Sequence, residues 1–332
     1  MAVPAFLARE RIVARPGFNR WLIPPAALAV HLSIGQAYAT SVYKNALVEH
    51  FETGNTPIGI IFSIAIVMLG LSAALFGTWL DKNGPRAAMA TSMVFWVSGF
   101  LVGSLGIFTQ QLWLVYLGYG VLGGIGLGIG YISPVSTLIK WFPDRPGLAT
   151  GLAIMGFGGG ALIAAPLSRQ LMGFYDPAYN PADTTSVPSG EAVALLFLTL
   201  AAVYAVFMSF GAAIIRVPAA DWRPAGFDPA SVKKKSLVTT DNVSAANSVK
   251  TPQFWLLWTV LFCNVTAGIG ILEQAQPMIQ DFFRRGEESL VATAAAAGFV
   301  GLLSLFNMAG RIVWSSTSDY IGRKRIYMVY LG

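Results

Sequence analysis

The chain has 332 residues, of which 55% are hydrophobic and only 11% are charged, and its formal net charge is +6. Soluble domains carry roughly 25% charged residues and an apolar fraction near 45–50%, so a soluble globule of this size has too little interior for so much apolar surface. This composition argues against soluble enzymes, nucleic-acid-binding proteins and disordered chains. The single cysteine, Cys263, and the two histidines, His31 and His50, provide neither a disulfide framework nor a zinc centre. The sequence therefore predicts a multi-pass membrane protein without a cofactor.

Apolar runs that are long enough to cross a bilayer recur along the whole chain. A spanning helix needs about 20 mostly apolar residues. Eight such runs cover residues 21–43, 57–80, 88–108, 112–138, 148–168, 192–216, 253–280 and 290–314. A ninth run begins at Ile326. Because none of them shows the alternation of a membrane β-strand, the predicted fold class is all-α, a helical bundle with about eight complete transmembrane helices and the start of a ninth.

The basic residues gather on one side of the predicted membrane. With the N-terminus in the cytoplasm, the cytoplasmic segments are 1–20, 81–87, 139–147, 217–252 and 315–325. With Arg216 counted at the start of the fourth segment, they hold 17 of the 22 Lys and Arg residues, whereas the outer segments hold four. Such a bias is the positive-inside signature of membrane topology, so the positive charge does not indicate a nucleic-acid partner. The lysine run 233–235 adds at most a weak attraction to anionic lipid.

Two loops share one pattern, in which a small residue is followed by an aspartate, a glycine and a basic residue. The first copy, after the second span, consists of Gly77, Asp81, Gly84 and Arg86. The second copy, after the eighth span, consists of Ser315, Asp319, Gly322 and Arg323. The two aspartates are 238 residues apart, and the tryptophans that open spans one and seven, Trp21 and Trp255, are 234 apart. These nearly equal offsets indicate a duplicated membrane half. An aspartate at a helix end can accept hydrogen bonds from the N-terminus of a neighbouring helix, and glycine allows a sharp turn.

The repeat divides the chain into four predicted parts. They are a cytoplasmic N-terminal segment (1–20), a six-helix membrane half (21–216), a cytoplasmic linker (217–252) and an incomplete second membrane half (253–332). With the same offset, the second half is expected to end at about residue 454, roughly 120 residues beyond Gly332. We therefore expect the chain to be truncated in its ninth span.

Three further stretches carry a resemblance to a known family. They are Asn-Arg-Trp at 19–21, Lys-Trp-Phe-Pro-Asp-Arg-Pro-Gly-Leu-Ala-Thr-Gly at 140–151, which contains Asp144 and Arg145, and Thr-Pro-Gln-Phe-Trp at 251–255. With the loop motifs, they resemble the major facilitator superfamily, and within it the oxalate/formate antiporter family, with the monocarboxylate transporters next. Ser315 departs from the glycine usual at its position. The resemblance implies a twelve-helix bundle that acts as a monomer, multi-pass, in a bacterial inner membrane.

Arg311 is the first candidate for substrate binding. It lies eight residues before Asp319, about 12 Å along a helix, where an arginine costs on the order of 2.5–3.5 kcal/mol and needs an interior partner or water. A guanidinium at that depth can bind a carboxylate through two parallel hydrogen bonds. The resemblance assigns this role to an arginine of span eight at this place in the motif. The alternatives are a structural ion pair and snorkelling to the inner face. By spacing, Arg311 shares a helical face with Ser304, Asn307 and Ser315, and we expect this stripe to line a wet cavity.

Residues of spans one and four complete the predicted site. The resemblance places aromatic cavity residues in these spans, where Tyr38 and Tyr131 match by local spacing, although packing between helices is an equal alternative. His31 shares a face with Tyr38; a neutral histidine that donates to a neighbouring helix is favoured over a proton-coupling role. Glu273, near the outer end of span seven, is expected to face external water rather than to couple transport.

The glycine-rich runs are predicted to be mechanical. Residues 118–130 contain a GxGxxG pattern, but no strand precedes it, so the dinucleotide-binding interpretation fails. Small residues let membrane helices approach and slide, and the run at 155–160 in span five has the same character. The candidate residues named above supply neither a nucleophile with its base nor a phosphate-binding loop. The sequence therefore predicts no enzyme and no ATP-driven pump.

The function predicted from these observations is secondary transport of small carboxylates by alternating access. Oxalate/formate-type anion exchange is the first hypothesis. Proton-coupled transport of a monocarboxylate such as lactate, pyruvate or formate is the alternative, with protons as the coupling ion. A dianion would need two cations, and in the sequence only Arg311 lies at depth. A hypothesis of a different class is a truncated membrane protein that does not transport.

Overall fold

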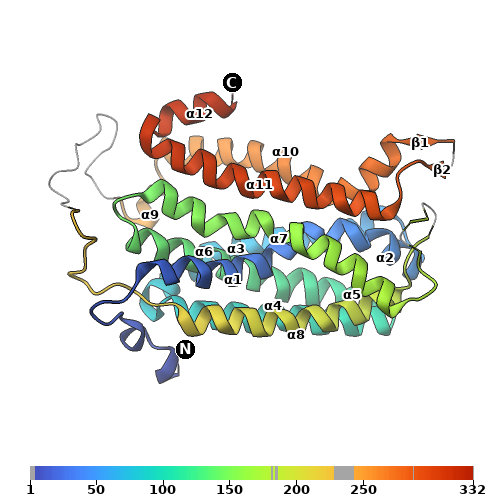
Figure 1. Cartoon of the computed structure of the whole chain (residues 1–332), viewed down its shortest axis with the longest axis horizontal. Coiled ribbons are helices and arrows are strands. Elements are labelled where there is room, and N and C mark those ends of the chain that lie inside the picture. Colours follow the sequence, from blue (N-terminus) through green and yellow to red (C-terminus); the bar gives the residue numbers. More distant parts are fainter. Residues whose placement is uncertain (1–3, 181, 184–185, 228–242, 287, 332) are drawn as a thin grey trace.

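Long helices that run side by side form almost the whole structure (Figure 1). The computed structural model describes residues 4–180, 182–183, 186–227, 243–286 and 288–331. Two short antiparallel strands, β1 (Arg284–Arg285) and β2 (Glu288–Ser289), form a hairpin at one end of the bundle. The predicted all-α fold class is confirmed.

Seven helical stretches of the described residues are long and apolar enough to cross a membrane. They are α3 (Asn55–Asn83), α4 (Pro85–Phe108), the continuous run of α5 (Leu112–Val115), the π-helix η5 (Tyr116–Gly123) and α6 (Gly124–Trp141), then α7 (Pro146–Tyr175), α8 (Gly190–Ile214), α10 (Pro252–Phe282) and α11 (Thr293–Ile321). They coincide with predicted spans two to eight. The largest differences are at the ends of spans five and eight, which continue to Tyr175 and Ile321 instead of ending at 168 and 314, because the polar residues that follow each apolar run remain helical.

The first span is the one that the sequence described wrongly. The predicted single helix over 21–43 is instead a 3-10 turn η3 (Arg20–Leu22), α1 (Ile23–Ile34), a nine-residue 3-10 helix η4 (Gly35–Tyr43) and α2 (Lys44–His50). Gly35 begins the 3-10 stretch at a close approach to α7, since a methyl group there would lie 2.5 Å from the Phe157 carbonyl oxygen. The stretch is also tied across its length, because the Gln36 amide donates to the Tyr43 hydroxyl (3.0 Å). A 3-10 run of this length is unusual and often marks a functional position.

The short elements distinguish the two ends of the bundle. One end carries the N-terminal 3-10 turns η1 (Ala5–Leu7) and η2 (Arg9–Ile12) together with α9 (Ala245–Ser248) and α12 (Arg323–Leu331) (Figure 1). We call it the basic end, since most of the Lys and Arg residues belong to its segments, and we call the opposite end, with β1 and β2, the far end. The predicted linker starts by pairing with the N-terminal segment, through Val217 and Val13. Its residues 228–242, with the lysine run, lie outside the described part, and α12 begins at Arg323, three residues before the predicted ninth span.

Glycines of α6 bring this helix against the backbone of α4. A methyl group at Gly126 would lie 2.6 Å from the Trp96 nitrogen and 2.9 Å from the Ser92 carbonyl oxygen. The Ser92 hydroxyl uses this proximity and donates to the Gly126 carbonyl (2.6 Å). The prediction that this glycine run allows close helix packing is therefore confirmed.

We expect Gly126→Ala to lower the thermal unfolding midpoint in detergent by several degrees, because overpacking against rigid backbone costs about 1–3 kcal/mol. The matched control is Gly77→Ala in α3, where an added methyl group has no neighbour within 4 Å among the described residues. Static light scattering during a thermal ramp measures the midpoint of each variant. Equal midpoints for the two variants would contradict the close packing of α6.

Candidate functional site

The two predicted membrane halves meet where α11 packs along α7 (Figure 1). The glycine run of α7 makes the contact close: a methyl group at Gly158 would lie 2.5 Å from the Asn307 amide oxygen and 2.9 Å from the Arg311 Nε. A methyl group at Gly159 would likewise lie 2.6 Å from the Met308 sulfur. Polar side chains of α11 therefore lie directly on the backbone of α7.

Arg311 lies at this contact between the halves. Its Nε donates to the Asn307 side-chain oxygen (2.8 Å) and its Nη1 donates to the Ile154 carbonyl of α7 (3.2 Å). Its Nη2 approaches the Tyr38 hydroxyl of η4 at 3.5 Å, the longest of these contacts. These partners account for three of the five guanidinium N–H groups, and the most weakly held face is the one toward η4. The predicted residues Arg311, Asn307 and Tyr38 are therefore neighbours.

An aromatic cluster lies next to the guanidinium. The Phe157 ring of α7 is 5.6 Å from the Arg311 Cζ, within the range of a cation–π contact. It packs edge-on against Tyr38 at 4.8 Å and against Tyr131 of α6 at 5.2 Å between ring centroids. Sequence reasoning missed Phe157, although it is the one aromatic residue within the glycine run 155–160.

His31 is fully buried behind this cluster. Its Nδ1 faces the Ala153 carbonyl of α7 and its Nε2 lies 3.1 Å from the Tyr131 carbonyl of α6. A neutral imidazole can donate to one of these carbonyls. This placement between two helices favours the interpretation of His31 as a residue that hydrogen-bonds to neighbouring helices.

The polar stripe of α11 packs on α7 at Ser304. The hydroxyl of this residue donates to the Gly158 carbonyl (2.6 Å) and accepts from the Leu162 amide (2.9 Å), and its side chain is fully buried. At this position the stripe lines no wet cavity, contrary to expectation, because Gly158 lets α11 come too close. Ser315 likewise faces Gly151, where a methyl group would lie 3.3 Å from the serine Cβ.

The second loop motif joins the two halves at the basic end. The Asp319 carboxylate, at the end of α11, accepts from the Gly147 amide (2.9 Å) and the Leu148 amide (3.1 Å) in the first turn of α7. Arg323 pairs with the same carboxylate at 3.2 Å. An anion at a helix N-terminus is stabilised by unpaired amides and by the helix dipole, so this contact holds α11 against α7.

The first loop motif has the same backbone turn as the second, but its aspartate and arginine contact different groups. Gly84 and Gly322, equivalent in the two copies, both have a left-handed backbone, with φ of +88° and +89°. The Asp81 side chain, however, is 69% exposed and lies 3.8 Å from Lys140. The Arg86 guanidinium donates to the last carbonyls of α8, Ala212 and Ala213. In the described structure Gly77 makes no close helix contact.

Two of the stretches that carried the family resemblance meet at the basic end. Arg20 binds Asp144 through two parallel hydrogen bonds of 2.8 and 3.1 Å, and its guanidinium lies 4.5 Å from the centre of the Phe142 ring. It also donates to the Trp141 carbonyl (3.2 Å). The neighbouring Arg145 is exposed. This cluster fixes the start of span one to the loop before α7.

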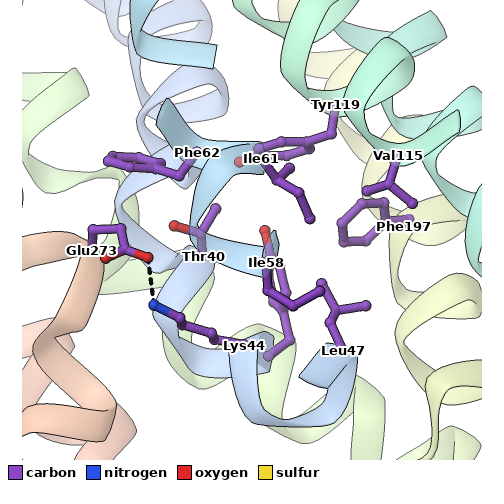
Figure 2. Close-up of a pocket in the computed structure, with 11 residues that line it drawn as sticks. Thr40, Lys44, Leu47, Ile58, Ile61, Phe62, Val115, Tyr119, Phe197 and Glu273 are labelled. Carbon is purple, nitrogen blue, oxygen red and sulfur yellow. Dashed lines mark hydrogen bonds and ion pairs between the residues drawn. The ribbon is translucent and has the colours of Figure 1, made fainter. Parts of the chain in front are cut away.

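A buried ion pair nearer the far end was not predicted. The Nζ of Lys44 on α2 lies 2.6 Å from the Oε1 of Glu273 on α10 (Figure 2). The Lys44 side chain is 3% exposed and the Glu273 side chain is 15% exposed. The expectations that Glu273 faces external water and that Arg311 is the only cation at depth were therefore wrong. The pair was hidden because its members are 229 residues apart and Lys44 follows a span whose predicted end was too early.

Within the described residues, no group of three or more His, Cys, Asp and Glu side chains is arranged to hold a metal ion. A bundle whose two halves meet around a half-buried arginine, next to an interrupted helix, is typical of a secondary transporter. The chain belongs to the Major Facilitator Superfamily, which matches residues 26–332. It is a transporter and not an enzyme.

Among curated proteins, the chain is similar to three kinds of carboxylate transporter. It is 26% identical over 315 residues to the oxalate:formate antiporter of Oxalobacter formigenes, covering 95% of this chain and 67% of that protein. It is 30% identical over 237 residues to apicoplast pyruvate carrier 1 of Toxoplasma gondii, covering 61% of this chain and 43% of the carrier. It is 28% identical over 153 residues to human monocarboxylate transporter 11, covering 46% of this chain and 32% of the transporter.

We expect Asp319→Asn to lower the thermal midpoint in detergent, because hydrogen bonds to a charged acceptor contribute about 1.5–3 kcal/mol. Asp81→Asn, the equivalent change in the first copy, is expected to have less than half of this effect, since its carboxylate is exposed. Thermal unfolding of the two variants measures the difference. Equal destabilisation would argue against the contact between Asp319 and α7.

Stability below about pH 4 is expected to depend on Arg20. Burial raises the pKa of Asp144, but the Arg20 hydrogen bonds and charge outweigh it, so the pKa is lowered in the folded protein. The stabilisation is therefore present above the unfolded pKa of about 3.9 and is lost as pH falls through the folded value. In a pH series of unfolding midpoints, Arg20→Gln should flatten the decline on the acid side, whereas Arg145→Gln should flatten it much less, because Arg145 lowers the pKa of Asp144 only through its charge and makes no hydrogen bond to it. A decline unchanged in Arg20→Gln would refute this assignment.

Proposed function

We propose that the protein is a secondary transporter of small carboxylates and that Arg311 binds the carboxylate. The observation that carries the proposal is the position of this guanidinium. It lies where α11 of one half meets α7 and η4 of the other, with its weakest contact toward Tyr38. A carboxylate that replaces the 3.5 Å contact with Tyr38 can form two parallel hydrogen bonds with the Nη groups. Tyr38, Asn307 and Tyr131 then form the wall of the site, with Phe157.

Alternating access fits the contacts on the two sides of Arg311. At the basic end Asp319 binds the first turn of α7, and toward the far end Lys44 binds Glu273. Both contacts join the two halves, so opening one side requires the loss of one contact while the other persists. The glycines of α7 allow α11 to slide during this motion. We propose Asp319 and Arg323 as part of the inner closure and Gly84 and Arg86 as the fixed turn of the first half.

The orientation follows from charge. The basic end faces the cytoplasm by the positive-inside rule, which also places the N-terminus inside. We propose the inner membrane of a bacterium as the location and a monomer as the working unit, with Asp144 anchoring Arg20 on the cytoplasmic side.

Exchange of one small carboxylate for another, as in oxalate/formate antiport, is the first mode that we propose, and it rests on the similarity to the antiporter of Oxalobacter formigenes. Proton-coupled transport of a monocarboxylate is the second candidate. A specific observation favours it, namely the buried carboxylate of Glu273 beside a single lysine. Lys44 also supplies a second buried cation, so a dianion is not excluded by charge.

Arg311→Lys is expected to reduce carboxylate counterflow in proteoliposomes at least tenfold, because lysine keeps the charge but loses the planar fork that binds both carboxylate oxygens. Labelled oxalate, formate and lactate are tested in turn. The control is Arg15→Lys in the N-terminal segment, where the side chain is exposed and lines no described pocket, and this variant should transport like the wild type. Counterflow that survives Arg311→Lys, or none with any of these substrates in the wild type, would refute the proposal.

A further inference from the structure

The ion pair between Lys44 and Glu273 lies inside the membrane bundle, away from the candidate carboxylate site. Glu273 is nine residues before the end of α10 at Phe282, roughly 13 Å along the helix. Other carboxylates of the described spans, such as Asp81 and Asp319, lie near helix ends. Of the acidic residues in the described helices, Glu273 is therefore the one held deep within a span.

The surroundings of Glu273 are mostly apolar, so Lys44 is the neighbour that stabilises the charge of its carboxylate. Apolar side chains line most of the pocket beside the pair, among them Ile58 and Phe62 (Figure 2). On α3, Gly59 lies beside the carboxylate, since a methyl group there would be 3.2 Å from the Glu273 Oε1. This glycine therefore leaves room for the carboxylate.

Other titratable groups stand further from the carboxylate. The phenols of Tyr43 (η4) and Tyr119 (η5) line the same pocket, and both hydrogen-bond to Gln36. On α11, which packs against α10, the titratable side chains are Arg311, Asp319 and Tyr320, and none of them lines this pocket. On η4, Tyr38 faces Arg311.

A polar pocket leads from the far end to the flanks of the pair. Its polar lining comes from both halves and includes Asn45, Asn55, Ser186, Gln276, Gln280 and Arg284. Asn45 follows Lys44 directly, and Gln276 lies one turn beyond Glu273. The Gln276 side-chain oxygen is buried and has no hydrogen-bond partner in the described part of the chain. This pocket therefore places side-chain amides next to the pair, on its far-end side.

Two buried opposite charges constrain each other. Neutralising one of them leaves the other uncompensated in a medium of low dielectric constant, which is strongly unfavourable. Protonation of Glu273 therefore requires another anion at Lys44, and an anion can occupy Lys44 only when Glu273 gives up its charge. The pair thus links the binding of a proton to the binding of an anion.

We propose that Glu273 is the proton-binding site of a proton–carboxylate cotransport, an inference that rests on the proposed function. A proton from water at the far end is transferred to the Glu273 carboxylate, and the arriving carboxylate replaces it as the counter-ion of Lys44, which stays an ammonium. The pair is neutral before this step, and the lysine, the neutral acid and the bound anion are neutral together after it. The substrate then passes inward to Arg311, and loss of the proton to the opposite side restores the ion pair.

The test compares two activities of one set of proteoliposomes, which are counterflow of labelled lactate and accumulation driven by a pH gradient, acid outside. In Glu273→Gln the ratio of driven accumulation to counterflow is expected to fall at least tenfold. Glu49→Gln, an exposed carboxylate on α2 that lines neither of these pockets, is the control and should keep the wild-type ratio. Lys44→Gln with Glu273→Gln removes both charges together, so no uncompensated charge is left in the fold. Driven accumulation is expected to be lost from it as well, and its counterflow is expected to fall because Lys44 no longer holds the arriving carboxylate.

The outcomes separate this inference from the proposed function. A wild-type ratio in Glu273→Gln, or wild-type counterflow without any accumulation under a pH gradient, would overturn the proton site and leave carboxylate transport intact. Absence of counterflow in the wild type, repeated with formate and oxalate, would refute the proposed function and the proton site with it. If Glu273→Gln, which keeps Lys44, is monodisperse but shows no counterflow, Glu273 is needed for carboxylate binding itself, and the coupling role is wrong.

Discussion

A positive charge at membrane depth is tolerated only where polar groups surround it, and Arg311 organises its neighbourhood accordingly. Its own helix supplies Asn307, the facing helix supplies the Ile154 carbonyl, and the interrupted first span supplies Tyr38. The glycines of α7 are what allow these groups to converge, because a methyl group at Gly158 would collide with the guanidinium. The contact between the two halves is thus built around the solvation of one side chain.

The same principle explains how the ends differ. At the basic end a carboxylate is satisfied by the amides of a helix N-terminus, so Asp319 needs no arginine or lysine from the other half. Toward the far end, Glu273 is compensated by a side chain of the other half, Lys44. Across the two halves, the first contact is made between a carboxylate and backbone amides, and the second between two oppositely charged side chains.

Much of the fold could be predicted from the sequence, because a membrane helix is encoded locally by the length of its apolar run. The repeat was also readable, since both of its glycines have the left-handed backbone that the turn requires. Contacts between distant residues could not be predicted. Nothing in the sequence near Lys44 or Glu273 indicates that these two residues, 229 positions apart, form an ion pair. The interruption of span one escaped for a related reason, because the apolar content of 21–43 is unbroken and the constraint comes from α7 against Gly35. Phe157 was overlooked since an aromatic side chain carries no polar signal.

The nine-residue 3-10 stretch of span one changes the angular phase of everything that follows it. A 3-10 helix advances about 120° and 2.0 Å per residue, against about 100° and 1.5 Å in an α-helix. Over nine residues the difference amounts to about half a turn and roughly 4–5 Å. If residues 35–43 wound as an ordinary α-helix, Lys44 would point away from α10 and stand nearly one helical pitch further in. The 3-10 winding of η4 therefore sets the direction and height of the Lys44 side chain, and it determines whether this lysine and Glu273 can form an ion pair.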